Sequence, residues 1–176
     1  MKIVVQKGKL SEMTADAYVL GFNPTHYSLD KERNEVEHAG SHGIKSFVDY
    51  RLVKQRNGTP LKQGEAICID AGEGNSRKIV CIICRNQNKD YDLMKNSIRE
   101  GLMDLFMCSE KHSLKHVAMA PLCVSDGLEI NAFIDAFKSA VSNYKGKHCI
   151  EMVTIVTPKS EDQELHLKAL KRAFNL

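Results

Sequence analysis

The sequence has no apolar run long enough to cross a lipid bilayer. Charged side chains at Lys2 and Lys7 interrupt its first apolar residues, which excludes the continuous apolar segment of a secretory signal peptide. It also lacks any run of lysine and arginine interleaved with aromatic residues, the pattern typical of nucleic-acid-binding surfaces, and its formal net charge is only +3. We therefore expect a cytoplasmic protein with neither a nucleic-acid partner nor a membrane partner.

The composition is that of one ordinary globular domain. The chain has 176 residues, of which 43% are hydrophobic and 27% are charged. This length supplies enough interior for a single sizeable core, and the balance of residue types is unlike that of a disordered chain. The sequence contains no internal repeat, low-complexity tract or linker, so we predict a single domain over residues 1–176.

The six cysteines do not predict disulfides or a metal site. Cys68, Cys81, Cys84 and Cys149 fall within apolar runs typical of buried strands, and free thiols suit a reducing compartment. Cys81 and Cys84 have the spacing of a CxxC metal motif, but residues three apart in a strand point to opposite faces. We therefore expect no metal and no cofactor.

The periodicity of apolar residues predicts alternating strands and helices. Expected strands cover residues 2–6, 16–23, 65–70, 78–84, 117–120 and 149–156. Expected helices cover residues 30–39, 41–57, 92–111 and 162–174, and another begins just after Asp126. This order predicts an α/β fold, a three-layer αβα sandwich in which helices cover both faces of a mixed six-stranded sheet.

The segment from residue 117 to residue 144 carries the main functional signal. A short apolar run ends at Pro121, and from Ile130 the apolar residues recur with helical spacing. Asp126 and Glu129 between them resemble a capping box, which predicts that the helix begins just after Asp126. Such a turn directs backbone N–H groups above the sheet, the usual place for an anionic ligand. The alternative is a turn that is capped for stability alone.

Four motifs, placed on these elements, resemble the macrodomain family over nearly the whole chain. They are Asp16-Ala-Tyr-Val-Leu-Gly-Phe-Asn23 at the end of a strand, Gly40-Ser-His-Gly-Ile44 at a glycine-rich loop, Gly64-Glu-Ala66 at the start of the next strand, and Pro121-Leu-Cys-Val-Ser-Asp-Gly-Leu128 at the second loop. The macro-like N-terminal module of leucine aminopeptidases is similar to the same pattern.

The resemblance implies a ligand of the ADP-ribose type. Two loops would grip its diphosphate, and Asn23 would reach its distal ribose. Glycines in both loops permit backbone N–H groups to converge on phosphate oxygens. Phe22 follows the strand into the cleft and could stack on a base or ribose, or else be a core aromatic. The residues expected around the ligand are Lys9, Phe22, Asn23, Ser41, Gly43, Ile44, Ser125, Gly127 and Leu128.

Three positions depart from the family pattern. Lys9 stands where the family has an aspartate that accepts from the adenine amino group, and an ammonium can only donate. Leu20 replaces an asparagine and removes a polar contact. Asp126 places a carboxylate where a small neutral residue is usual, so it would repel phosphate and compete for the helix N–H groups. From Lys9 we predict a preference for oxo-purines over adenine, the alternative being a lysine in solvent.

Candidate catalytic residues are few. Asp126 is the one carboxylate placed to activate a water near a ribose, although a helix-capping role explains it equally well. His42 is the only histidine expected to face the cleft, where it could act as an acid or base. His38 and His42 are four apart, but Gly40 lies between them, so we interpret them as surface loop residues rather than metal ligands.

Two function classes follow. The first is binding of a nucleotide-derived, ADP-ribose-like metabolite, either as a reader or with weak ADP-ribosyl hydrolase activity. The second is a macro-like module without a ligand, which acts through protein contacts or in an oligomer. The departures at Lys9, Leu20 and Asp126 favour the second class. The first class is favoured by Asn23, Gly43 and Gly127.

Overall fold

A computed structural model describes residues 1–22, 61–71, 75–86, 88–157 and 164–176. It contains strands and helices in the alternating order that the sequence predicts. The strands are β1 (Lys2–Lys7), β2 (Ala15–Phe22), β3 (Ala66–Asp70), β4 (Ser76–Ile83), β5 (His116–Met119) and β6 (Met152–Thr157). The α-helices are α3 (Tyr91–His112), α4 (Ile130–Asn143) and α5 (Glu164–Ala173), and two short 3-10 helices are η1 (Leu10–Glu12) and η2 (Val124–Asp126).

The strands form one mixed six-stranded sheet in the order β1-β6-β5-β2-β4-β3. All neighbours pair in parallel except β3 and β4, which pair antiparallel as the predicted hairpin. The central strands are continuous apolar runs because a parallel sheet is buried on both faces. The sheet predicted from the sequence is thereby confirmed.

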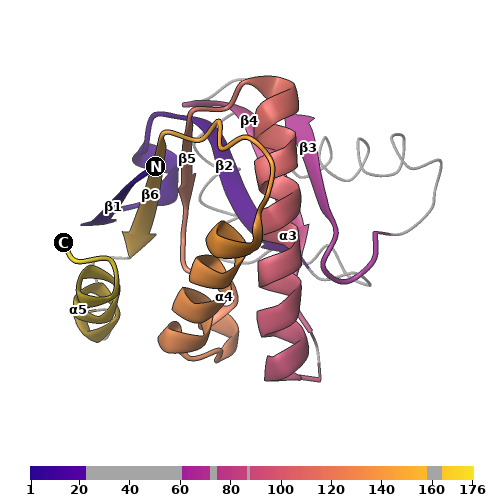
Figure 1. Cartoon of the computed structure of the whole chain (residues 1–176). Helices are drawn as coiled ribbons and strands as arrows, with labels where there is room; N and C mark the ends of the chain where they lie inside the picture. The colour runs from indigo at the N-terminus through magenta and orange to yellow at the C-terminus, as the bar shows by residue number, and fades with distance from the viewer. Residues whose placement is uncertain (23–60, 72–74, 87, 158–163) are drawn as a thin grey trace.

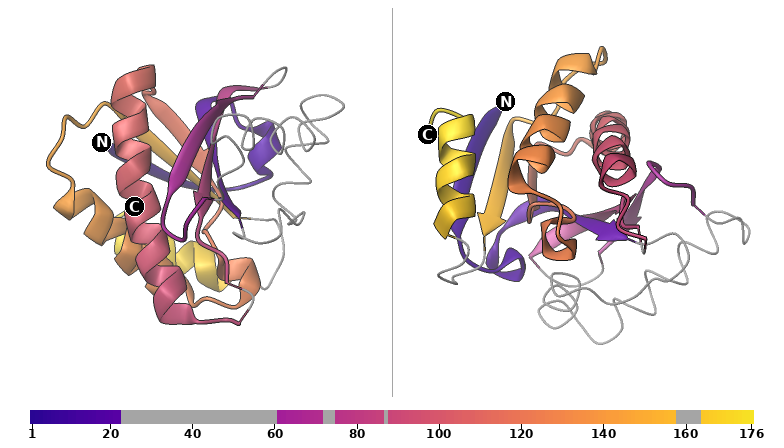
Figure 2. Two further views of the ribbon diagram at one scale, coloured as in Figure 1. Left: turned by 90° about the vertical axis from the view of Figure 1, so that its right-hand side faces the viewer. Right: turned by 90° about the horizontal axis from the view of Figure 1, so that it is seen from below.

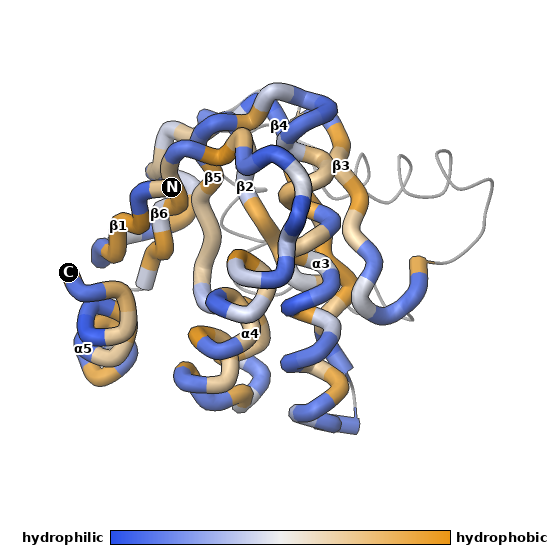
Figure 3. The backbone as a smooth tube through the Cα atoms, viewed as in Figure 1, coloured by the Kyte–Doolittle hydropathy of each residue, from blue (hydrophilic) through white to orange (hydrophobic). Residues whose placement is uncertain are grey.

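The three described helices pack against one face of this sheet, as the view from below shows (Figure 2). Their apolar sides meet β-strand residues in one core cluster that includes Phe106, Phe133 and Leu170. Asp90 caps the start of α3 by accepting a hydrogen bond from the Leu93 N–H at 3.0 Å. Hydrophilic residues lie on the outer sides of α3 and α4 (Figure 3). Each helix is thus amphipathic, with its apolar stripe against the sheet.

The opposite face of the sheet carries a second core cluster. It includes Tyr18, whose hydroxyl donates to the Met13 carbonyl at 2.6 Å and ties η1 to β2. Cys81 belongs to this cluster and Cys84 to the first one. The prediction that their sulfurs lie on opposite faces is confirmed. No group of three or more metal-ligating side chains occurs among the residues that the structure describes.

The boundary of α4 differs from the prediction. The helix begins at Ile130, with Glu129 as its N-cap residue, and not just after Asp126. The capping box was wrong because Gly127, at φ +99°, turns the chain out of the helical path after η2. The helices expected over residues 30–39 and 41–57 lie outside the described residues. In the described part of the chain, no helix combines the length and the apolar character needed to span a membrane.

Candidate functional site at the carboxyl edge of the sheet

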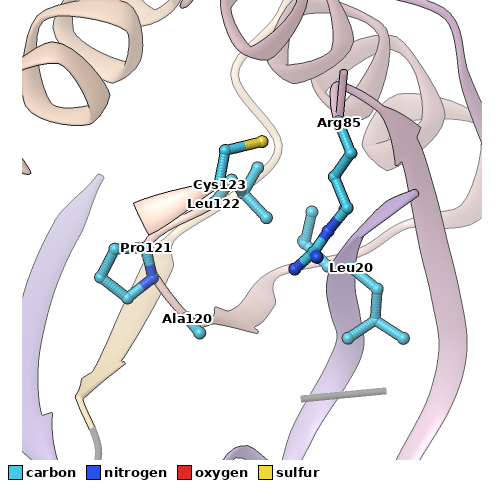
Figure 4. Close-up of a pocket in the computed structure, with 8 residues that line it drawn as sticks. Leu20, Arg85, Ala120, Pro121, Leu122 and Cys123 are labelled. Carbon is cyan, nitrogen blue, oxygen red and sulfur yellow. The ribbon is translucent and has the colours of Figure 1, made fainter. Parts of the chain in front are cut away.

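The carboxyl ends of β2, β4 and β5 meet at one edge of the sheet because these three strands are parallel neighbours. A small hollow of about 10 Å³, room for roughly one water molecule, lies at this edge. Its lining comes from the end of β2, from the residue that follows Cys84 after β4, and from the loop after β5 (Figure 4). The lining residues are Val19, Leu20, Gly21, Arg85, Ala120, Pro121, Leu122 and Cys123.

Gly21 keeps this hollow open on the β2 side. A Cβ atom at this position would lie 3.0 Å from the Cys84 sulfur and 3.6 Å from Arg85 Nε. Real Cβ atoms rarely lie 3.0 Å from another atom, so a side chain at Gly21 would displace the Cys84 sulfur, just after β4. The glycine in the strand motif is therefore required by a close approach between neighbouring chain segments.

The loop after β5 is held mainly by its own backbone. Cys123, at φ +61°, and Gly127, at φ +99°, reverse the chain on either side of η2. The N–H groups of Asp126 and Leu128 both donate to the Cys123 carbonyl, at 3.0 and 3.1 Å, and the Gly127 N–H donates to Val124 at 3.1 Å. These donors, which the sequence suggested for phosphate oxygens, are already used inside the loop.

The Asp126 side chain pairs with an arginine and does not cap α4. Arg85 Nη1 donates to Asp126 Oδ1 at 2.8 Å, and Arg85 Nη2 donates to Ser125 Oγ at 3.2 Å. The N-cap of α4, Glu129, makes no side-chain capping bond. The capping role expected for Asp126 was therefore wrong, because the ion pair and the turn at Gly127 hold its carboxylate toward β4.

Arg85 lines the hollow and is the charged residue of this edge that sequence reasoning missed. It lies two residues after the end of the apolar strand β4, and its side chain is only 15% exposed. The side chain points into the hollow between Leu20 and the loop after β5 (Figure 4). The sequence signal that could have identified Arg85 is a positively charged residue just beyond the carboxyl end of a buried apolar strand. The second Asp126 oxygen, Oδ2, is buried and accepts no hydrogen bond from the described residues. The pair thus places opposite charges at the mouth of the site.

Two thiols lie beneath the arginine. Cys123 Sγ is 3.4 Å from both the Cys84 sulfur and the Cys84 carbonyl oxygen, and both side chains are almost fully buried. The hydrogen bond that Cys123 donates to Cys84, together with burial, raises the pKa of the Cys123 thiol well above its ordinary value. These thiols are structural neighbours in the core and not activated nucleophiles.

The other residues expected around a ligand have separate placements. Ser125 and Gly127 are exposed on the loop beside Arg85, and Leu128 is buried in the core at 3% exposure. Phe22 is 1% exposed and belongs to the second core cluster, as expected of a core aromatic rather than an open stacking surface. Lys9 is exposed beside η1 and does not line the hollow. Outside the described residues lie Asn23, Ser41, His42, Gly43 and Ile44.

The opposite, amino-terminal edge of the sheet carries a second charged cluster. Asp16 accepts hydrogen bonds from the backbone N–H groups of Lys115 and His116, at 2.8 and 2.9 Å, and pairs with Arg77 at 2.5 Å. Burial by itself raises the pKa of Asp16, but the two backbone bonds and Arg77 outweigh it and hold the pKa below its ordinary value. This carboxylate joins the starts of β2 and β5.

The comparisons with known proteins agree on the fold. No protein-family model matches the sequence, and no curated protein matches it significantly. The structure is similar to the Oceanobacillus iheyensis macrodomain with ADP, at 16% identity and a TM-score of 0.78 over 96% of this chain and 90% of that one. It is also similar to the Trypanosoma brucei macrodomain in complex with ADP-ribose, at 9% identity and a TM-score of 0.72 over 96% and 68%.

A third similar structure is the macro domain of ganglioside induced differentiation associated protein 2. Its identity to this chain is 14%, its TM-score is 0.75, and the match covers 98% of this chain and 84% of that one. Sequence identities this low establish the architecture alone. The described sheet, its strand order and these likenesses together show that the chain has a macrodomain-like fold.

Proposed function

We propose that this protein binds a nucleotide-derived metabolite of the ADP-ribose type at the carboxyl edge of its sheet. The observation that carries the proposal is the likeness, over 96% of the chain, to macrodomain structures that hold ADP and ADP-ribose. Ligands of open α/β sheets bind outside the carboxyl ends of the strands, where the hollow beside Gly21 and Arg85 lies. The expected cytoplasmic location stays a prediction.

The described residues support binding more directly than catalysis. Arg85 supplies a positive charge at the mouth of the hollow, and Gly21 lines the hollow from β2. Asp126 is the carboxylate that would activate a water if the protein also hydrolyses ADP-ribosyl bonds. In the structure Oδ1 of that carboxylate accepts from Arg85, so it is not poised as a free base. We therefore propose a binding module first and a weak hydrolase second.

One observation favours the ligand-free alternative. The hollow among the described residues admits only about one water molecule, and several loop N–H groups are used internally. A macro-like module that works through protein contacts needs no more space than this. Direct binding measurements separate the two functions.

The test is calorimetry on the purified full chain with ADP-ribose, ADP, the inosine counterparts and adenosine. A ligand at one hundred times its dissociation constant stabilises a protein by about 2.7 kcal/mol, so thermal unfolding gives an independent readout. We expect saturable binding of a diphosphate-bearing nucleotide with one site per chain. Absence of heat and of thermal stabilisation with every compound would contradict the proposed function and favour the ligand-free module.

A further inference from the structure

Four features of the Arg85–Asp126 pair suggest that it does more than stabilise the fold. It joins residues 41 positions apart in the sequence, it lies at the mouth of the hollow, it is only partly exposed, and one carboxylate oxygen is buried without a hydrogen bond from the described residues. A pair built only for stability would be expected to satisfy both carboxylate oxygens. This geometry leaves an acceptor unsatisfied and keeps an arginine fork in the ligand path.

Arg85 is the one charged side chain among the described residues that line the hollow. The N–H groups of Asp126, Gly127 and Leu128 donate to carbonyls within the loop, so they are not available to phosphate oxygens without rearrangement of the backbone. A guanidinium can instead offer parallel donors to a phosphate. In the structure, two of its nitrogens donate to Asp126 and Ser125. A phosphate, like the Asp126 carboxylate, presents negatively charged oxygens that can accept from both nitrogens.

We propose that Arg85 is the anion-binding side chain of this site, and this proposal rests on the proposed function. In the ligand-free protein, Asp126 forms a closed pair with Arg85, and a phosphate or diphosphate group must displace the Asp126 carboxylate in order to bind. In the closed pair, Asp126 acts as an internal competitor for the ligand. The apparent affinity equals the intrinsic affinity multiplied by the fraction of molecules in which Arg85 is released, so a mostly closed pair weakens binding. Asp126 thus sets a threshold of ligand charge below which the site stays closed.

The chemistry of the ligand follows from this exchange. A neutral nucleoside offers no group that can replace a carboxylate on the guanidinium, whereas a diphosphate offers several charged oxygens. We expect selection for di-anionic groups over neutral sugars and bases. Inorganic pyrophosphate and a nucleoside diphosphate can both replace the carboxylate on Arg85. Their affinities differ only by the contacts that the nucleoside makes with the rest of the site.

The test measures binding of ADP-ribose, ADP, inorganic pyrophosphate and adenosine to the full chain by calorimetry. Asp126→Asn keeps the size and shape of the side chain and removes its charge. We expect it to tighten binding of the phosphate-bearing probes by roughly tenfold, because the closed pair loses its charge attraction. Adenosine binding should not change. Pyrophosphate that binds as tightly as ADP would assign the site to the inorganic anion and still support the exchange.

The double variant Arg85→Met/Asp126→Asn removes both charges and so avoids an unpaired buried carboxylate. We expect it to lose the increase in affinity that Asp126→Asn produces, and to bind the phosphate probes at least about tenfold more weakly than Asp126→Asn does. Arg77→Met, which removes a comparable arginine from its pair with Asp16 at the opposite edge, is the matched control and should leave all affinities unchanged. Thermal unfolding of each variant establishes that it is folded.

Three results would overturn the proposal. ADP-ribose binding of equal strength in the wild type, Asp126→Asn and the double variant would leave the proposed function standing and remove Arg85 from it. Absence of binding in every variant, Asp126→Asn included, would refute both. A weaker affinity of Asp126→Asn for all phosphate probes would show that Asp126 assists the ligand and does not compete with it.

Discussion

The helix α3 approaches β4 so closely at Gly101 that a single methyl group should destabilise the protein. A Cβ atom at Gly101 would lie 2.2 Å from Ile82 Cγ2, and 3.2 Å from both Ile82 Cβ and Cγ1. Ordinary carbon–carbon contacts lie at about 3.5–4.0 Å. Ile82 is fully buried in a strand that pairs on both sides, so it cannot move aside. The Gly101→Ala substitution therefore forces helix and sheet apart.

The expected magnitude comes from two opposing effects. Overpacking of a tight core costs about 1–3 kcal/mol, and a clash of this depth against a β-branched residue belongs at the upper end. Replacing glycine by alanine inside a helix returns about 1 kcal/mol of helix propensity. We expect a net loss of about 2 kcal/mol, which lowers the melting temperature of a chain of this size by about 4–8 °C.

Urea unfolding of Gly101→Ala at neutral pH measures this loss. The control is Gly8→Ala, whose Cβ would lie 3.3 Å from Met13 Cε, the flexible end of a side chain, and should change stability by less than about 0.5 kcal/mol. Ile82→Ala removes the clashing atom, so adding Gly101→Ala to it should cost nothing further. A stabilised Gly101→Ala protein, or full additivity in the double variant, would refute the packing account.

Three further predictions concern single side chains. Because the pKa of Asp16 is held below its ordinary value of 3.8, this carboxylate contributes stability that is lost as pH falls below about 4. The urea midpoint should therefore fall less between pH 6 and pH 3 in Asp16→Asn than in the wild type, and an equal fall would contradict this prediction. Lys9, although exposed and outside the hollow, should favour oxo-purine over adenine nucleotides by about tenfold, since a charged donor to a carbonyl is worth roughly 1.5–3 kcal/mol. Lys9→Asp should reverse that order; equal affinities for the two purines would show that Lys9 does not contact the base. Cys123 should resist iodoacetamide at pH 8 in the native protein, because its thiol is buried and its pKa is raised, while the half-buried Cys149 reacts. Peptide mapping measures both rates, and labelling of Cys123 as fast as in the urea-unfolded protein would refute the prediction.

The architecture could be predicted from the sequence because its signals are local and repeated. The apolar run of β4 was expected at residues 78–84 and is found at Ser76–Ile83, and α3 was expected at residues 92–111 and is found at Tyr91–His112. Continuous β-branched runs and helical periodicity each involve many residues, so an error at one position does not change the element. The opposite orientations of Cys81 and Cys84 followed from strand geometry for the same reason.

The site was less predictable because its determinants are single residues with distant partners. A capping box at Asp126 and Glu129 is a sound local pattern, but the Asp126 carboxylate is held by Arg85, 41 residues earlier. No local pattern in the sequence reports that pairing. Gly21 is another such determinant, because the sulfur that crowds a side chain there belongs to Cys84, a residue just after β4 and distant in the sequence.

The pairing also changes what the departure at Asp126 means for function. Considered by itself, a carboxylate in the second loop repels phosphate and favours a module that has lost its ligand. The structure supplies the matching cation, so the two side chains together add no net charge to the edge of the sheet. In the proposed exchange, an anion that replaces the carboxylate on Arg85 releases Asp126 toward solvent, which recovers the hydration of its buried Oδ2 atom. The cost of opening the pair is then partly offset by the hydration of Asp126, so the carboxylate in the second loop is compatible with ligand binding under this proposal.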